Sequence, residues 1–245
     1  ANGAQLAVPG LVIPSGHTRS MMGSATLGLS GVLRNEGFLM SIGGGTDKIQ
    51  VLSYAERVSV LQASASPFGL PSIDLPTSGT TLRTEVDLMV SGNLTVAAGA
   101  AFEAEARKAT FSLANTLTAN GLCQFHDLTL VGTTTLAAGT AFRVTGSLTM
   151  PGGMLTCSGG AANVITIDGG SFDNDAPGDF SCGTSRVVFS GQNPKLPLGN
   201  LTTFFDVEIA ATGTAQARAA TYFVQRKWIA STGAYDAFSV GAAQE

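Results

Sequence analysis

Four aspartates lie close together beyond the middle of the chain, and their type and spacing suit chemistry better than any other residues. Asp168, Asp173, Asp175 and Asp179 fall within the segment TIDGGSFDNDAPGDFSCG. Paired carboxylates serve as general acid and base in glycoside hydrolysis, and Asp173, Asp175 and Asp179 also offer oxygen ligands to calcium. Pro177, however, stands where an EF-hand loop needs its next ligand, and the closing Glu is missing. We expect a solvated turn, with calcium binding as the first alternative and catalysis as the second.

The other residue types that carry catalysis are isolated from one another. His17 and His126 are the only histidines, and no metal-ligand spacing links them. Serines are plentiful, but no G-x-S-x-G nucleophile elbow occurs. The segment GGGTDK at residues 43–48 lacks the Gly-Lys-Ser/Thr order of a phosphate loop, because Asp47 intervenes. We therefore predict that the protein is not an enzyme and has no cofactor beyond the calcium alternative.

The three cysteines are Cys123, Cys157 and Cys182, an odd number with no CxxC pair, which disfavours a zinc site. The spacing between Cys157 and Cys182 is close to one coil of the architecture argued below. Two interpretations stay open: a disulfide between stacked coils, or three buried thiols that act as small hydrophobic residues.

Composition excludes several classes of protein. The chain has 245 residues, of which 44% are hydrophobic and 12% are charged, about half the roughly 25% charged residues of an average soluble chain. Its net charge is −4, so it lacks the basic footprint of a nucleic-acid binder. No apolar run approaches the roughly 18 residues of a membrane-spanning helix. The apolar fraction is ample for a core, which argues against disorder.

The elements that would position these residues repeat along the chain. Residues 87–102, DLMVSGNLTVAAGAAF, match residues 127–142, DLTLVGTTTLAAGTAF, at an offset of 40 with nine of sixteen identities. A weaker echo pairs residues 125–130 with residues 204–209. Fixed-period self-similarity is the signature of repeat architectures. A sandwich or a pair of jelly rolls, the rival all-β folds, does not predict such a match.

Within the repeat, apolar residues alternate with small or polar ones, as Leu88 and Val90 do, which places them on one face of a short strand. We therefore predict an all-β fold, a β-solenoid (β-helix) of short stacked coils of about 20 residues each, so that the 40-residue repeat is two coils. Phe102 and Phe142 then occupy equivalent positions and are expected to stack in the core. The recurring residues Asp87, Asp127 and Asp206 are expected to serve as turn or cap residues.

The N-terminal part differs from the repeat, and we divide the chain into three parts. Residues 1–14 are expected to form an extended arm, apolar around Pro9, with Leu6, Val8, Leu11 and Ile13 as assembly residues. Residues 15–81 are expected to form a distinct β region that ends in a Pro-rich irregular connector over 63–81. The segment 48–62 fits a helix or strands, and strands are favoured because its residues are β-branched. Residues 82–245 are expected to form the solenoid.

One segment resembles a pattern of bacterial extracellular repeat proteins. In residues 186–209, RVVFSGQNPKLPLGNLTTFFDVEI, a strand ending in Phe-x-Gly leads into a Phe-rich strand at 204–209. Residues 92–96, GNLTV, and 146–150, GSLTM, supply the matching "G-NLT" element. The pattern is similar to that of autotransporter-like and filamentous-haemagglutinin-like β-solenoid surface proteins, over about residues 86–230. The resemblance implies secretion, surface exposure, adhesion or fibre formation, and no catalytic residues.

These observations favour a structural role. We expect a non-enzymatic subunit, extracellular or at the cell surface, that self-assembles into a fibre or surface layer by strand addition from its N-terminal arm. The first alternative is a virion protein such as a phage spike, fibre or capsid decoration. The second is a carbohydrate-active or glycan-binding β-helix centred on Asp168–Asp179. The expected partners are further copies of the chain, with cell-surface or host glycans as a second class, and neither nucleic acid nor a membrane span is expected.

Overall fold

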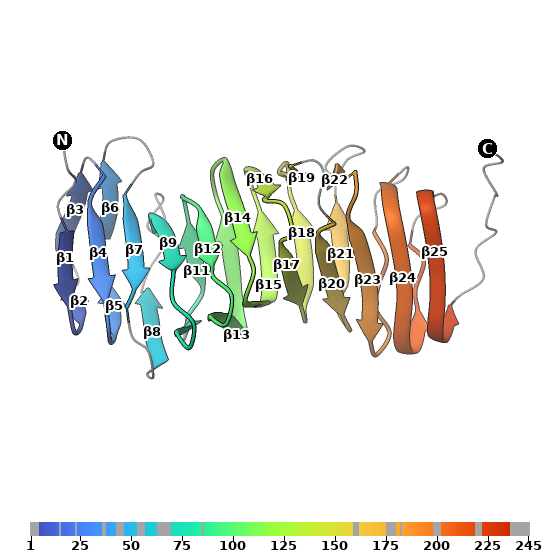
Figure 1. The fold of residues 1–245 in the computed structure, drawn as a ribbon, viewed down its shortest axis with the longest axis horizontal. Helices are drawn as coiled ribbons and strands as arrows, with labels where there is room; N and C mark the ends of the chain where they lie inside the picture. Colours follow the sequence, from blue (N-terminus) through green and yellow to red (C-terminus); the bar gives the residue numbers. More distant parts are fainter. Residues whose placement is uncertain are drawn as a thin grey trace.

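The structure, a computed structural model, describes residues 5–14, 16–22, 24–35, 38–42, 47–52, 57–62, 70–84, 86–158, 162–174, 180–181, 183–197, 202–218 and 222–235. Regular structure in these residues consists of strands, and they contain no helix. The strands stack into a rod with the first coil at one end and the last coil at the other (Figure 1). All the pairs between these strands are parallel, which makes the fold the predicted β-solenoid.

A complete coil contributes one strand to each of three faces, which we name A, B and C. Face A, a nine-stranded sheet, contains β1 (Gln5–Val8), β4 (Thr26–Leu29), β7 (Lys48–Val51), β9 (Ser72–Leu75), β12 (Leu94–Val96), β14 (Asn115–Ala119), β16 (Thr133–Leu136), β19 (Met154–Cys157) and β22 (Phe180–Ser181). Face B contains β2 (Leu11–Ile13), β5 (Leu33–Asn35), β8 (Arg57–Gln62), β10 (Thr81–Thr84), β13 (Ala101–Phe111), β15 (Leu122–Leu130), β17 (Ala141–Val144), β20 (Val164–Asp168), β23 (Arg186–Gly191), β24 (Thr202–Ala215) and β25 (Tyr222–Tyr235).

Face C contains β3 (Thr18–Met22), β6 (Phe38–Ile42), β11 (Leu88–Val90), β18 (Ser147–Met150) and β21 (Ser171–Asn174). The last residues of β13 and β15 also belong to face C, because these strands bend round a corner and pair there with β11 and β18. One long sheet therefore covers two faces of the rod.

The register between strands confirms that a coil is about 20 residues long and that the 40-residue repeat corresponds to two coils. On face C, Leu88 stacks on Ala109 and Ala109 stacks on Leu128, so the 40-residue repeat spans two coils. On face A the register departs from the sequence alignment by two residues, because Leu94 stacks on Leu117 and Leu117 on Leu136. The shift is even, so it leaves the same residues facing inward. The echo between residues 125–130 and 204–209 has no such counterpart, because the column that starts at Phe125 reaches Ile209 in β24, and not Phe204.

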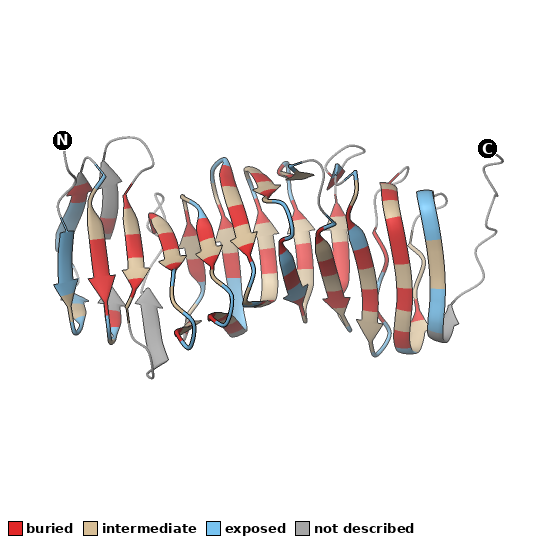
Figure 2. Ribbon diagram, viewed as in Figure 1, coloured by how far each residue is buried: buried red, intermediate tan, exposed pale blue. Residues whose placement is uncertain are grey.

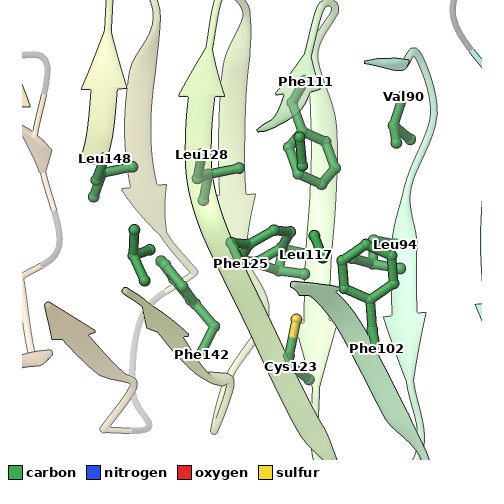
Figure 3. Close-up of a cluster of buried hydrophobic side chains, with 14 of the residues drawn as sticks. Val90, Leu94, Phe102, Phe111, Leu117, Cys123, Phe125, Leu128, Phe142 and Leu148 are labelled. Atoms are coloured by element: carbon green, nitrogen blue, oxygen red, sulfur yellow. The ribbon is translucent and has the colours of Figure 1, made fainter. Parts of the chain in front are cut away.

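The core consists of columns of apolar side chains inside the rod. Figure 2 shows that buried positions recur on the strands along the rod. Phe102 stacks on Cys123, and the register continues to Phe142 in the next coil. The predicted stacking of Phe102 and Phe142 is therefore indirect. Phe125, from the coil between them, contacts both rings, with centroid distances of 5.3 Å and 6.0 Å, as Figure 3 shows.

The expectation of an extended arm at residues 1–14, outside the repeat, is wrong. In the described part of this segment, β1 pairs with β4 and β2 pairs with β5, so residues 5–13 supply the first two strands of the first coil of the solenoid. The physical reason is that alternating apolar residues are compatible with an edge strand of the stack as well as with a free extended arm, so the pattern does not distinguish the two. Pro9 lies in the turn between the two strands, where it removes no ladder hydrogen bond.

The rest of the N-terminal part also continues the stack. Segment 48–62 forms strands, β7 and β8, as favoured. The irregular connector expected over 63–81 is wrong in its described half, where β9 pairs with both β7 and β12; residues 63–69 lie outside the described residues. The same pairing carries both sheets across residue 82, since β10 pairs with β8 and β13. Pro71 and Pro76 lie just outside β9, one before it and one after it, so these prolines mark the ends of a strand and do not interrupt the stack.

Candidate assembly surfaces

The aspartate cluster is divided by the fold. Asp168 ends β20 on face B, where it forms an ion pair with Arg143 of the preceding coil and accepts a hydrogen bond from Ser190 Oγ at 2.9 Å. Asp173 lies in β21 on face C, forms an ion pair with Arg218 and accepts a hydrogen bond from Ser171 Oγ at 2.8 Å. Each carboxylate is thus held by an arginine and a serine. The two ion pairs and the Ser190 bond join one coil to another, which is a structural role, whereas the Ser171 bond lies within β21.

Of the three residues of the calcium alternative, Asp173, Asp175 and Asp179, the structure describes Asp173. Asp175 and Asp179 lie outside the described residues. In the part of the chain that the structure describes, no group of three or more His, Cys, Asp or Glu side chains is placed to hold a metal ion. The described part therefore supplies one carboxylate to that alternative, and Arg218 already neutralises it.

The two histidines are far apart in the stack, and each has a local role. His126 lies in β15, half-buried, with Nδ1 3.1 Å from Thr145 Oγ1 of the next coil. The backbone N–H of His17 donates to the carbonyl of Pro14 at 3.1 Å and closes the turn before β3. His126 is therefore a half-buried strand residue, and His17 is a turn residue.

Two of the three recurring aspartates cap the coil that follows them. The backbone N–H of Lys108 donates to Asp87 Oδ1 at 3.0 Å, and that of Ser147 donates to Asp127 Oδ1 at 2.7 Å. Asp206 differs: it is buried in β24 and accepts two bonds from the Arg226 guanidinium, one of them from Nε at 2.8 Å. These bonds raise the pKa of Arg226 above its usual value. The expectation of a turn or cap role holds for Asp87 and Asp127, whereas Asp206 serves an ion pair.

Several other charged side chains form ion pairs between neighbouring coils. Three pairs share one geometry, in which the carboxylate lies two residues beyond the position stacked on the cation: Lys48 with Asp74, Arg143 with Asp168, and Arg186 with Glu208. Because such a pair needs one particular register, it favours the observed stacking over a slipped one. The charged side chains that the sequence offers for chemistry therefore fix the stack.

The cysteines occupy different environments. Cys123 is a free thiol in the core, and burial raises its pKa far above the usual value. Cys157 takes part in a disulfide. Cys182, the only other cysteine of the chain, lies outside the described residues. The interpretation as three buried thiols is therefore wrong for Cys157, and it is correct for Cys123.

The first coil leaves the core uncovered at one end of the rod. One inward column of face A runs from Leu6 through Leu27, Ile49, Ile73, Leu94 and Leu117 to Leu136. Leu6 is 58% exposed, whereas the other six are at most 6% exposed. Of the expected assembly residues, Leu6 is exposed, Val8 and Leu11 are half-buried, and Ile13 is buried. Three of these four residues therefore reach the N-terminal end surface.

The last coil leaves the core uncovered at the other end. Val207 of β24 is fully buried, but Trp228, which stacks on it from β25, is only partly covered, as are Tyr222 and Val224. Sequence reasoning missed these three aromatic and apolar residues as assembly candidates. Their alternation in YFVQRKW follows the strand period and was a usable signal.

The part of the chain that the structure describes contains no helix, and therefore no helix long and apolar enough to cross a membrane.

Comparison with protein-family models, with curated proteins and with solved structures gave no match. The resemblance to autotransporter-like and haemagglutinin-like surface proteins therefore depends on the sequence pattern alone. The structure therefore has two end surfaces, one at the first coil and one at β25, where residues of the core columns are exposed or only partly covered.

Proposed function

We propose that this protein is a non-enzymatic structural subunit that assembles with copies of itself into a fibre, through the ends of its solenoid. The observation that carries the proposal is the exposure of core columns at both ends. Inside the rod, stacking covers each inward side chain from both sides. Leu6 is 58% exposed although its position is a core position. A further coil from another molecule would bury it.

The sheet edges support the same proposal. Among the described strands, β1 and β2 end their sheets on one side and β25 ends its sheet on the other. An unprotected edge presents a row of unpaired backbone N–H and C=O groups, which template pairing with another chain. Strands β1 and β2, QLAV and LVI, carry no charged residue that would discourage such pairing. The joint is thus a stacked coil, and not the free arm that the sequence suggested.

We further propose that the assembly forms outside the cytoplasm. The disulfide of Cys157 supports this, because disulfides persist in oxidising compartments and are rare in the cytosol. The absence of enzymatic activity is also part of the proposal. It is supported by Asp168 and Asp173, since each described carboxylate of the cluster is bound by an arginine.

Negative-stain electron microscopy of the untagged protein over a range of concentrations tests the proposal. We expect uniform fibres for the wild type. The variant Leu6→Lys places a charge in an exposed column end and should abolish fibres while leaving the thermal unfolding midpoint within about 2 °C of the wild type, because an exposed position contributes little to stability. The matched control is Leu113→Lys, since Leu113 has the same residue type and the same 58% exposure on the side of the rod.

The outcomes separate the candidate functions. Fibres that survive Leu113→Lys but not Leu6→Lys support end-to-end assembly. Wild-type protein that stays monomeric at every concentration contradicts the proposal. Closed trimers of defined size contradict it as well, and they favour a virion component.

A further inference from the structure

We infer that the joint between copies is head-to-tail: the first coil of one copy stacks on β25 of the next copy and continues its parallel sheets. This inference depends on the proposed function and adds the register and polarity of the joint. It follows from three features of the two ends, namely strand direction, column alignment and charge.

Strand direction favours a head-to-tail joint. Each pair of neighbouring coils in the described part stacks parallel strands in the same order, so a first coil placed beyond β25 repeats a relation already present throughout the rod. A joint between two N-terminal ends requires antiparallel pairing instead. It would also leave Val224 and Trp228 uncovered at the outer ends of the pair. The head-to-tail joint covers both ends of each copy at once, and it does not close, so it grows into a filament.

The column alignment fixes the register. One inward column of face B begins at Leu11, passes Leu33 and Val60 of the next two coils, and ends at Ile209 and Ala230. Its residues between Thr84 and Ile209 are at most 3% exposed: Thr84, Ala104, Phe125, Val144, Ile167, Phe189 and Ile209. Leu11 is half-buried, Leu33 is buried and Ala230 is exposed, so among the column residues whose burial is described the column is open at its two ends. Stacking Leu11 of one copy on Ala230 of another makes the column continuous.

Charge argues against a joint between two C-terminal ends. Arg226 and Lys227 lie next to each other on β25, and both are exposed. Two β25 strands paired with each other would bring two Lys227 side chains together, beside two Arg226 side chains that Asp206 already neutralises, and like charges across a strand pair are destabilising. Strands β1 and β2 are uncharged, so the N-terminal end meets β25 without this repulsion.

Cysteine cross-linking tests the joint. In the inferred register Val12, which follows Leu11, lies beside Ser231, which follows Ala230. Both residues are exposed, and stacked residues of neighbouring strands are about 4.8 Å apart, within the roughly 4.4–6.8 Å that a disulfide spans between Cα atoms. The background is low because Cys123 is buried and Cys157 is already oxidised.

The expected products follow from polarity. Under mild oxidation at fibre-forming concentration, a variant with both Val12→Cys and Ser231→Cys should give a ladder of covalent multimers on a non-reducing gel. An equimolar mixture of the two single variants should give dimers, and each single variant alone should stay monomeric. The control with Leu113→Cys and Ser231→Cys should stay monomeric too.

Each other outcome overturns a defined part of the inference. Dimers from Val12→Cys alone would show a joint between N-terminal ends. Fibres in the electron microscope without covalent products from the double variant would overturn the head-to-tail register while self-assembly stands. The absence of both fibres and cross-links would overturn the proposed function together with this inference.

Discussion

Asp87 and Asp127 hold the same position in two neighbouring copies of the sequence repeat, and each accepts the backbone N–H of the residue stacked on it in the next coil. Asn93 does the same with an amide oxygen, which accepts the N–H of Thr116 at 2.8 Å. Side-chain oxygens at strand starts thus satisfy donors that the parallel ladder leaves over. The repetition of aspartate in the sequence reflects this hydrogen bond.

Replacing Asp127 tests the capping bond. Asp127→Ala should lower the free energy of unfolding by about 1–2 kcal/mol, because the N–H of Ser147 loses its acceptor in a half-buried setting. Asp127→Asn keeps an acceptor oxygen, as Asn93 does naturally, and should recover at least half of that loss. Urea unfolding followed by circular dichroism measures both. Equal destabilisation by Ala and Asn would show that charge, and not the hydrogen bond, is what Asp127 contributes.

Phe125 links two columns of the core, and truncating it should be costly. It is fully buried and contacts the rings of Phe102, Phe111 and Phe142. Phe125→Ala should destabilise the protein by about 3–5 kcal/mol through lost burial and the cavity that remains. Phe223→Ala is the control, since Phe223 is 46% exposed and should cost less than about 1 kcal/mol. A small effect at Phe125 would contradict the close packing of these coils.

Gly170 occurs where two coils approach too closely for any side chain. A Cβ built at this residue would lie 1.4 Å from the carbonyl oxygen of Gly146, a backbone atom that cannot rotate away. Gly170→Ala should therefore destabilise the protein by more than about 2 kcal/mol. Gly183→Ala is the matched control, because nothing lies within 4 Å of its Cβ position and its φ is not positive. Thermal melts of the two variants should differ by several degrees, and similar melts would contradict this register.

The architecture could be predicted from sequence because the signals that specify it are local and repeated. Alternation at Leu88 and Val90 defines a strand face, and the 40-residue match defines the stack. The N-terminal coils were missed because Leu6 and Val8 resemble the repeat in pattern but not in identity. A solenoid coil needs only inward apolar residues and small corners, so its sequence drifts without loss of structure.

The roles of the charged residues could not be predicted, for a different physical reason. Asp168 and Asp173 lie five positions apart in sequence, but the corner between β20 and β21 directs them to different faces. Their arginine partners, Arg143 and Arg218, are 25 and 45 residues away. Sequence spacing shows which carboxylates are close along the chain, whereas the coil register decides what each one meets.

Thr84 is a buried polar residue in the inward column of face B, where it stacks on Val60 of the preceding coil. It is 3% exposed, and its hydroxyl oxygen has no hydrogen-bond partner. An unpaired buried hydroxyl costs about 1–3 kcal/mol, and valine has nearly the same shape. Thr84→Val should therefore raise the free energy of unfolding by about 1 kcal/mol in urea titration. Destabilisation would mean that the hydroxyl is bonded in solution, and Thr84→Ser, which keeps it, would then be the milder change.

Cys123 should be inert in the folded protein and reactive only after unfolding. Its thiol is 2% exposed between Phe102 and the following coil, and burial raises its pKa, so the nucleophilic thiolate does not form at neutral or mildly alkaline pH. A thiol reagent at pH 8 should label fewer than about one in ten molecules in the time that labels unfolded protein completely. Mass spectrometry of peptides identifies the labelled cysteine, and the Cys157 peptide should stay unlabelled until a reductant is added.

Adding urea to the transition midpoint should expose Cys123 in step with the loss of the circular dichroism signal of the strands. Rapid native labelling would show that the central coils open locally, and it would place the weakest part of the rod at its centre and not at its ends.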